Sequence, residues 1–442
     1  MDAPADPLKV GDVHSFRYRD RQLHCEGVNL EEVAEKIGTP VYVYSGGTIL
    51  DHYRRLDEAL GGLDHEICYA VKANSNRAIL RLLAEAGAGF DIVSGGELFR
   101  VLRAGGDPGR CSFAGVGKSA EEIEYALDQG VACFNLESEA ELTDIARIAA
   151  KKNVRAPFAF RVNPDVDSGS HRYITTGRSE NKFGIALDRA LALFETAARL
   201  PQLTIRGVQM HIGSQITETA PFAEAIARMT PLVLELKKTY GIEFFSIGGG
   251  MGIVYESALA SGSSAWWKTD QTGALSIKGY AAAIVPPLRA LDLRILLEPG
   301  RFLVGNAGIL LTRIRYLKQT GQKKFAIVDA GMNDLIRPAL YQSYHEIVPL
   351  RAPESAARET IDIVGPVCES ADFFAQDRAM PPLAEGDLVA IMSAGAYGFV
   401  MASNYNSRPL PAEVLVDGSS FGLIRERQTL PDLVRGECDP NS

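Results

Sequence analysis

The stretch at residues 66–76, EICYAVKANSN, sets the pattern for the first two thirds of the chain. Its apolar, aromatic and β-branched residues lead to Lys72, where the chain turns polar. The next stretch, NRAILRLLAEAG (76–87), carries apolar residues three and four positions apart. This order predicts a buried strand followed by a helix.

The same strand-and-helix unit recurs along the chain up to about residue 305. Helix-like runs at 96–106, 119–130 and 138–152 separate the first strand candidates and repeat the helical spacing. Eight strand candidates are present: EICYAVKA (66–73), GAGFDIVS (87–94), RCSFAGV (110–116), ACFNLES (132–138), APFAFRVN (156–163), IRGVQMHIG (205–213), EFFSIGGG (243–250) and RILLEPG (294–300). Eight such units in about 250 residues predict a TIM (β/α)8 barrel over residues 46–305.

The pattern of predicted elements changes after residue 305. Strand-like pieces such as FAIVDAG (325–331), ETIDIVGPVC (359–368) and AEVLVDG (412–418) follow without long helices. They predict a mainly antiparallel β-domain over residues 306–442, to which we expect residues 1–45 to contribute strands. Residues 258–276 form a long polar insertion after the seventh barrel strand, to which the sequence assigns no role.

Composition narrows the classes of function. The formal charge is −9 with no long run of either sign, so nucleic acid is not an expected partner. We find no signal-peptide pattern and no apolar run of membrane-spanning length, so we expect a soluble cytoplasmic protein. The six cysteines are scattered without CxxC spacing, which predicts reduced thiols and no metal site.

Chemically versatile residues fall where the predicted barrel strands end. In a TIM barrel these ends form one rim, which carries the active site. The rim residues are Lys72, Asp91, Arg161, Asn163, His211, Gly248–Gly250 and Glu298. Taken singly, each has a plainer explanation: a solvated lysine, a hydrogen-bonded core histidine, a tight turn, or a glutamate paired with Arg301. Their common position favours a shared site.

This set of groups suits pyridoxal 5'-phosphate. A desolvated Lys72 would provide a nucleophilic amine for a Schiff base. Glu298 beside the pyridine nitrogen would favour the protonated ring, which is the stronger electron sink. The backbone amides of GGGMG (248–252) can approach a phosphate closely, because no side chain intervenes.

Two other glycine-containing stretches do not fit nucleotide-binding motifs. SFAGVGKS (112–119) has Ser112 where a P-loop requires glycine. GGGMGIVY (248–255) departs from GxGxxG and follows the seventh predicted strand rather than the first.

Eight motifs together resemble the diaminopimelate decarboxylases, and the resemblance runs over nearly the whole chain. They are YAVKANSN, FDIVSGGE, HIGSQI, SIGGGMG, EPGR, MNDLIRPALY, GPVCESAD and GAYG. This family belongs to the alanine-racemase-like, fold-type III pyridoxal phosphate enzymes, whose fold is a TIM barrel plus a β-domain. The resemblance therefore implies the fold that the periodicity predicts.

The resemblance also implies roles for individual residues. Lys72 would carry the cofactor, His211 would stack on its ring and Glu298 would meet its nitrogen. The implied cofactor-binding set is Lys72, Asp91, His211, Ser214, Gly249, Gly250, Glu298, Gly300, Arg301 and Tyr397. The implied substrate-binding set is Arg301, Arg337, Tyr341, Glu369 and Tyr397. Cys368 would be the catalytic proton donor and would come from the partner subunit, which implies a homodimer with shared active sites.

The implied reaction is decarboxylation of meso-2,6-diaminopimelate to L-lysine and carbon dioxide, the last step of lysine biosynthesis. Two alternatives stay open: a decarboxylase of the same fold for ornithine, arginine or carboxynorspermidine, and a non-catalytic regulatory homologue. CES (368–370) together with Arg337 favours a substrate whose far end carries both a carboxylate and an amine. Ala371 departs from the glycine that commonly follows CES and puts the conformation of that loop in question.

Overall fold

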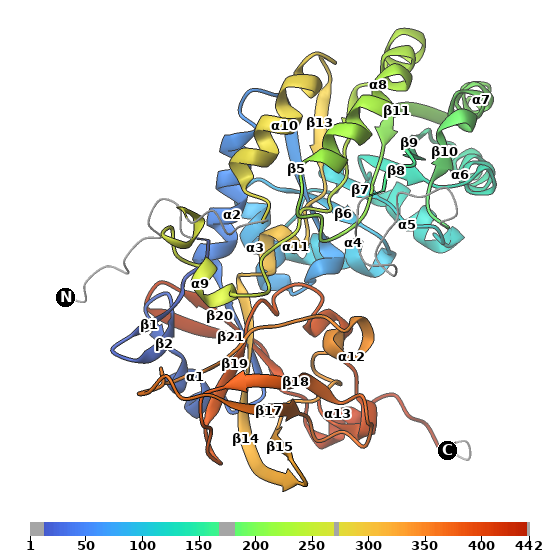
Figure 1. Ribbon diagram of the computed structural model, residues 1–442. Helices are drawn as coiled ribbons and strands as arrows, with labels where there is room; N and C mark the ends of the chain where they lie inside the picture. The colour runs from blue at the N-terminus through green and yellow to red at the C-terminus, as the bar shows by residue number, and fades with distance from the viewer. Residues whose placement is uncertain (1–12, 168–181, 269–273, 440–442) are drawn as a thin grey trace. The chain divides into compact units, whose positions relative to one another are not determined.

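The computed structural model describes residues 13–167, 182–268 and 274–439. It divides into two compact units. Figure 1 shows the chain coloured by residue number from blue at the N-terminus to red at the C-terminus. Of the described residues, 50–167, 182–253 and 274–303 form the barrel unit, and 13–49, 254–268 and 304–439 form the β-rich unit. Residues 269–273 of the predicted insertion and the first twelve residues lie outside the described residues.

The barrel unit contains a closed ring of eight parallel strands. Its strands are β5 (His65–Ala70), β6 (Gly89–Ile92), β7 (Cys111–Phe113), β8 (Cys133–Leu136), β9 (Ala156–Asn163), β11 (Leu203–Gln209), β12 (Phe244–Ser246) and β13 (Arg294–Leu297). They pair in chain order, β13 pairs with β5, and β8 pairs with β9, so the ring has no open edge. The short β10 (Ile185–Ala186) adds to β9. All eight predicted strands are present, and the TIM barrel is confirmed.

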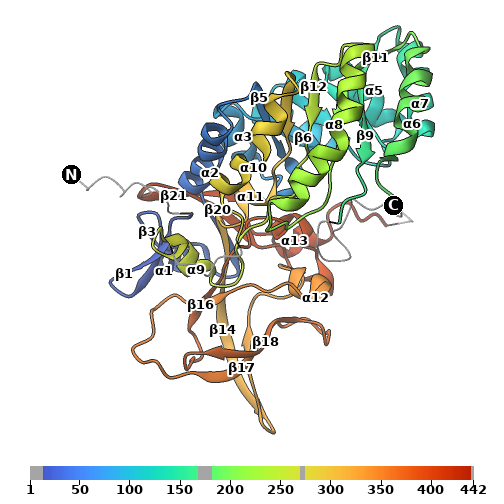
Figure 2. The ribbon, with the colours of Figure 1, turned by 45° about the horizontal axis from the view of Figure 1, so that its top comes forward.

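Helix α2 precedes the first barrel strand, and the other helices of this unit follow barrel strands (Figure 2). They are α2 (Gly46–Ala59), α3 (Arg77–Glu85), α4 (Gly95–Ala104), α5 (Ala120–Gln129), α6 (Glu139–Lys152), α7 (Leu187–Ala198), α8 (Ala220–Tyr240), α10 (Ile277–Arg289) and α11 (Arg301–Val304). Asn76, Ser94, Ser119 and Ser138 cap the N-termini of α3 to α6 through their side chains. Ser94 and Ser138 lie two residues after a strand end and Asn76 and Ser119 lie six residues after one, so the turns that carry the rim residues are short.

The β-rich unit contains a mainly antiparallel sheet. Its main path runs β18 (Phe373–Met380), β17 (Glu359–Val364), β15 (Lys323–Val328), β14 (Gly308–Thr320), β4 (Val41–Ser45), β20 (Ala412–Asp417) and β21 (Ser420–Arg425). The pair β19 (Leu388–Ile391) and β16 (Ile347–Pro349) branches from β14. Two pairings, β15 with β17 and β20 with β4, are parallel. The expected β-domain is thus present.

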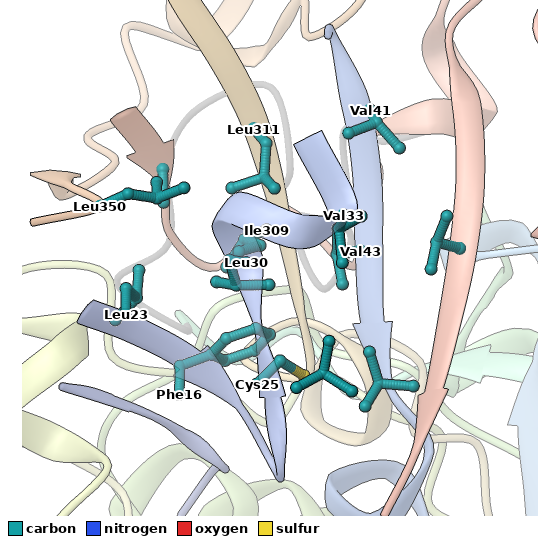
Figure 3. Close-up of a cluster of buried hydrophobic side chains, with 14 of the residues drawn as sticks. Phe16, Leu23, Cys25, Leu30, Val33, Val41, Val43, Ile309, Leu311 and Leu350 are labelled. Carbon is teal, nitrogen blue, oxygen red and sulfur yellow. The ribbon is translucent and has the colours of Figure 1, made fainter. Parts of the chain in front are cut away.

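The N-terminal segment is part of this unit. A small sheet of β1 (Phe16–Arg19), β2 (Gln22–Cys25) and β3 (Val28–Asn29) leads into helix α1 (Leu30–Ile37). Side chains of this segment pack with those of β4 and β14 in one buried apolar cluster, shown in Figure 3. Short helices α9 (Ala258–Ser261), α12 (Arg337–Tyr341) and α13 (Leu430–Leu433) complete the unit.

Two strands of the sheet, β14 and β18, were not predicted. β14 is the longest strand of the unit, yet its first five residues are buried and its last six are exposed. It therefore shows neither a continuous apolar run nor a clean alternation. Among the described residues, no helix is long and apolar enough to cross a membrane.

Candidate active site

Lys72 is presented by a short turn at the end of β5. The strand leads into a 3₁₀ turn at Val71–Ala73, and Asn76 then caps α3 by accepting from the Ala78 N–H at 2.9 Å. The Tyr69 hydroxyl donates to the Asn74 carbonyl at 2.9 Å and braces the turn from the strand side. These hydrogen bonds fix the backbone around Lys72, whose side chain is partly exposed on the barrel rim.

Asp91, on the neighbouring strand β6, forms an ion pair with Lys72. The aspartate is 1% exposed, whereas the lysine side chain is 38% exposed. Oδ2 of Asp91 accepts from the ammonium, and Oδ1 is buried without a hydrogen-bond partner among the described residues. Lys72 and Asp91, both predicted site residues, are thus in contact, and Asp91 Oδ1 remains available to a ligand.

Glu298, just after β13, is buried and held by two donors. The Ser246 hydroxyl donates to its Oε1 at 2.7 Å, and Gln209 Nε2 donates to its Oε2 at 2.8 Å. Burial, and then the charge of Asp91, raise the pKa of Glu298 to about 7, while Ser246, Lys72 and Gln209 oppose that rise. A positively charged ring nitrogen placed here would favour the carboxylate further.

His211 lies after β11 and contacts the glycine turn that follows β12. The Gly249 N–H donates to His211 Nδ1 at 3.2 Å, so Nδ1 is the unprotonated nitrogen. Burial, followed by the charges of Arg161 and Lys72, holds the pKa of His211 well below its ordinary value. The imidazole is therefore neutral and presents a flat face at this end of the barrel.

The glycine turn has no room for side chains. A Cβ on Gly249 would lie 2.2 Å from the Glu298 carbonyl oxygen, and one on Gly250, where φ is +103°, would lie 2.6 Å from the Gly213 oxygen. Close beside it, Arg301 Nη2 donates to the Ser214 hydroxyl at 3.0 Å. Gly300 is also confined, since its Cβ would lie 2.9 Å from that of Ala73.

Arg161 on β9 forms a buried ion pair with Glu137 at the end of β8. Its Nη1 donates to both carboxylate oxygens at 3.2 Å, and its guanidinium lies over the Phe183 ring. Glu137 also accepts from the backbone N–H groups of Gly115 and Gly184 at 3.1 and 3.0 Å. This carboxylate therefore holds three strand-end turns together. Arg161 Nη2 is buried without a hydrogen-bond partner among the described residues.

The other predicted residues lie in the β-rich unit. Arg337, the first residue of α12, is buried, and its guanidinium carbon lies 5.9 Å from the centre of the Tyr341 ring. Tyr397 lies in the GAYG turn after β19 and has a left-handed backbone with φ of +56°. Such a conformation is costly for a bulky residue and is commonly retained at functional sites.

Cys368 and Glu369 are exposed on one loop of this unit. The Cys368 N–H donates to Asn406 Oδ1 at 2.8 Å, and the Asp372 carboxylate accepts from the Val367 N–H at 2.6 Å. The loop is thus shaped by side chains on both sides of the thiol. Ala371 is not among the residues with positive φ, so alanine here needs no conformation reserved for glycine.

Several residues that support the site were not found from the sequence. They are Gln209 and Ser246 beside Glu298, Glu137 beside Arg161, and Glu97. Glu97 accepts from the Val93 N–H at 2.8 Å, and burial raises its pKa to about 7. The only sequence signal for Gln209 and Ser246 is a polar residue within an apolar strand.

Comparisons with known proteins agree with this geometry. Residues 46–305 match the family described as pyridoxal-dependent decarboxylase, pyridoxal binding domain. The diaminopimelate decarboxylase of Pseudomonas aeruginosa is 51% identical over 424 residues, which cover 96% of this chain and 98% of that protein.

Two solved structures have the same fold. One is diaminopimelate decarboxylase from Helicobacter pylori complexed with L-lysine, with TM-score 0.85, 41% identity, and coverage of 92% of this chain and 98% of that one. The other is the enzyme from M. jannaschii in co-complex with L-lysine, with TM-score 0.89, 36% identity, and coverage of 97% and 99%.

The barrel, its rim lysine and its buried glutamate define a pyridoxal-dependent decarboxylase. Within that class, the chain belongs to the diaminopimelate decarboxylase family. The residues present fit pyridoxal phosphate: an amine, a doubly held carboxylate, a neutral imidazole and a tight glycine turn share one rim. The buried Asp91 Oδ1 and Arg161 Nη2 are polar atoms that a ligand there could satisfy.

Proposed function

We propose that the chain converts meso-2,6-diaminopimelate to L-lysine and carbon dioxide, the last step of lysine biosynthesis. The observation that carries this proposal is the Lys72–Asp91 ion pair on the same rim as the buried Glu298. Lys72 would provide the reactive amine at one end of a pyridoxal ring, and Glu298 the carboxylate at the other end. The 51% identity to a named diaminopimelate decarboxylase supports the choice of substrate.

In this proposal Lys72 would be the residue that holds the cofactor covalently. When bound, pyridoxal phosphate supplies an electron sink for the charge that remains on carbon as carbon dioxide leaves. Glu298 keeps the pyridine nitrogen protonated, and Ser246 and Gln209 keep Glu298 oriented. Asp91 stabilises the ammonium form of Lys72 whenever the lysine is not bound to the cofactor.

The remaining cofactor-binding residues bind and orient. His211, half-buried and neutral, would provide a flat surface for the ring. Gly249, Gly250 and Gly300, with Ser214, Arg301 and Tyr397, hold the phosphate. Arg301, which donates to Ser214, also reaches the substrate. These residues would hold the cofactor in one position and orient the substrate against it.

The far end of the substrate carries a carboxylate and an ammonium group. Arg301, Arg337 and Tyr341 bind the carboxylate, because a planar guanidinium matches a carboxylate with two parallel hydrogen bonds. Glu369 binds the ammonium group, and Tyr397 assists. Ornithine lacks this second carboxylate, so these contacts favour diaminopimelate over ornithine.

Cys368 donates the proton that replaces the lost carboxylate. We propose that it comes from the partner subunit, so that a homodimer with two shared active sites is the working form. Its exposure on a loop shaped by Asn406 and Asp372 supports this assignment. A cytoplasmic location is part of the same proposal.

Carbon dioxide release from a panel of amino acids tests the function. We expect turnover of meso-2,6-diaminopimelate to exceed that of ornithine, arginine and carboxynorspermidine by at least about a hundredfold in kcat/KM. Preferential turnover of ornithine would replace the proposed substrate. No turnover of any of them would favour the regulatory alternative.

A second measurement tests the role of Lys72. The Lys72→Ala variant should lose both activity and the yellow absorbance of lysine-bound cofactor, while remaining folded, because the side chain is partly exposed. Lys36→Ala is the matched control, since Lys36 lies on the surface of the β-rich unit beside Glu32. Retention of the absorbance in Lys72→Ala would exclude this lysine as the attachment point.

A further inference from the structure

Arg337 is held from several sides within the β-rich unit. Its Nε donates to His345 Nε2 at 3.3 Å, and its Nη2 donates to the Ser343 hydroxyl at 3.3 Å. The guanidinium carbon lies 5.2 Å from the centre of the Tyr255 ring. The residue is 5% exposed, so these contacts are made away from bulk water.

The contact with His345 fixes the protonation of the imidazole. Arg337 has no lone pair to offer, so His345 Nε2 must be the acceptor. His345 Nδ1 lies 2.8 Å from the Met392 carbonyl oxygen, which can only accept, so Nδ1 carries the proton. His345 is therefore neutral in a single tautomer, and its own orientation is set by backbone at the end of β19.

Tyr255 completes the arrangement. Its ring meets the His345 ring edge-on, with centroids 5.1 Å apart and an interplanar angle of 80°. One aromatic ring thus packs against both partners of the hydrogen bond. Tyr255 comes from residues 254–270, which follow the seventh barrel strand and belong to the β-rich unit.

We propose that His345 is a positioning residue for Arg337 and sets the affinity for the distal carboxylate of the substrate. The inference rests on the proposed role of Arg337 as a binder of that carboxylate. With Nε directed at His345, the plane of the guanidinium is fixed before substrate arrives. Less conformational entropy is then lost when the planar fork binds. Tyr255 supports the same plane through its ring face.

The test compares two ligands that differ in the distal carboxylate. L-lysine has it, and 1,5-diaminopentane lacks it while keeping both amines. Binding of each is measured by calorimetry on cofactor-loaded protein for the wild type and for His345→Phe. That variant keeps a buried ring but removes the acceptor for Arg337.

We expect His345→Phe to weaken L-lysine binding by about tenfold or more and to change diaminopentane binding by less than about twofold. The KM for meso-2,6-diaminopimelate should rise by the same factor as the L-lysine Kd, with kcat within about threefold, because the distal contact is uniform through the reaction. His345→Gln, whose side-chain oxygen can stand near the position of Nε2, should recover most of the affinity.

His14→Phe is the matched control. His14 is equally buried in the same unit, where Nε2 lies 2.7 Å from the Ala258 carbonyl oxygen and Nδ1 accepts from the Phe16 N–H at 3.2 Å. This variant should alter stability without separating the two ligands. Equal losses for both ligands in His345→Phe, or no loss for either, would overturn the positioning role.

Failure of the proposed function would look different. If the wild type turned over ornithine and not meso-2,6-diaminopimelate, the substrate assignment would fall. The calorimetric comparison of L-lysine with diaminopentane would still report whether His345 acts on carboxylate recognition.

Discussion

Gln209 at the end of β11 reaches past β12 to donate a 2.8 Å hydrogen bond to Glu298, which follows β13. Ser246, on the intervening strand, donates to the other carboxylate oxygen. The charge-bearing group at the proposed ring nitrogen is thus oriented by two neighbouring strands. Neither donor is itself ionisable, so the pair orients the carboxylate without adding charge.

Glu298 should make the stability of the apoprotein depend on pH. Its pKa is raised from 4.5 to about 7 in the folded protein, so its contribution is fully present below pH 4.5 and is lost as pH rises through 7. We expect Glu298→Gln to gain stability over the wild-type apoprotein at pH 8, by up to about 3 kcal/mol, with a smaller difference at pH 5. Urea unfolding at the two pH values measures this.

In the cofactor-loaded enzyme the same substitution should be harmful to activity. With pyridoxal phosphate bound, Glu298→Gln loses an ionic partner for the ring nitrogen, and kcat should fall by about a hundredfold or more. A pH-independent difference between the two apoproteins would show that the glutamate is ionised throughout. Lys36→Ala again serves as the control variant.

The buried Arg161–Glu137 pair should be worth far more than a surface pair. Glu137→Gln leaves the guanidinium buried without its carboxylate, and we expect a loss of about 3–5 kcal/mol in unfolding free energy. Glu124→Gln, which breaks the exposed pair with Lys151, should cost less than about 1 kcal/mol. Similar losses in the two variants, measured by chemical denaturation, would contradict the role of Glu137 in tying the turns together.

Gly249→Ala should damage the cofactor site. The added Cβ would meet the Glu298 carbonyl at 2.2 Å, which forces backbone to move, and we expect a loss of about 1–3 kcal/mol together with weak cofactor binding. Gly96→Ala in α4 is the control, because the nearest atom to its Cβ lies 3.7 Å away. That change should stabilise the helix by about 0.5–1 kcal/mol. Normal cofactor absorbance in Gly249→Ala would argue against a phosphate-binding turn.

Mixing two inactive variants tests whether the active sites are shared. Lys72→Ala and Cys368→Ala dimers, dissociated and recombined in equal amounts, should regain about a quarter of wild-type activity, because half of the dimers contain one intact site. Mixing Lys72→Ala with itself is the control. If both residues acted within one subunit, no activity would return.

The fold could be read from the sequence largely because the barrel is built from local units. Each of the first four barrel strands leads within about seven residues to a helix that a serine or an asparagine caps, as Ser94 caps α4, so pattern and spacing suffice there. The partners of the rim residues could not be found in this way. Gln209 lies 89 residues from Glu298, and their contact exists only because three strands pair in register.

The strands of the β-rich unit are harder to predict from the sequence, for a related reason. β14 changes from buried to exposed along its length, and register shifts interrupt the pairing of β17 with β18. His345 illustrates the same limit within the site. In the sequence it is one histidine in LYQSYHEI, and only the fold turns its Nε2 toward Arg337.

The position of β4 between β14 and β20 has a consequence for biosynthesis. All five residues of β4 are buried, but one of their partner strands begins at Ala412. A ribosome adding about 5–20 residues per second needs roughly 20 to 70 s to make the intervening chain. Until those residues are made, the edge of β4 that pairs with β20 stays open on the nascent chain, although β14 is made earlier and can cover the other edge, so the VYVYS segment is a natural target for chaperones during translation.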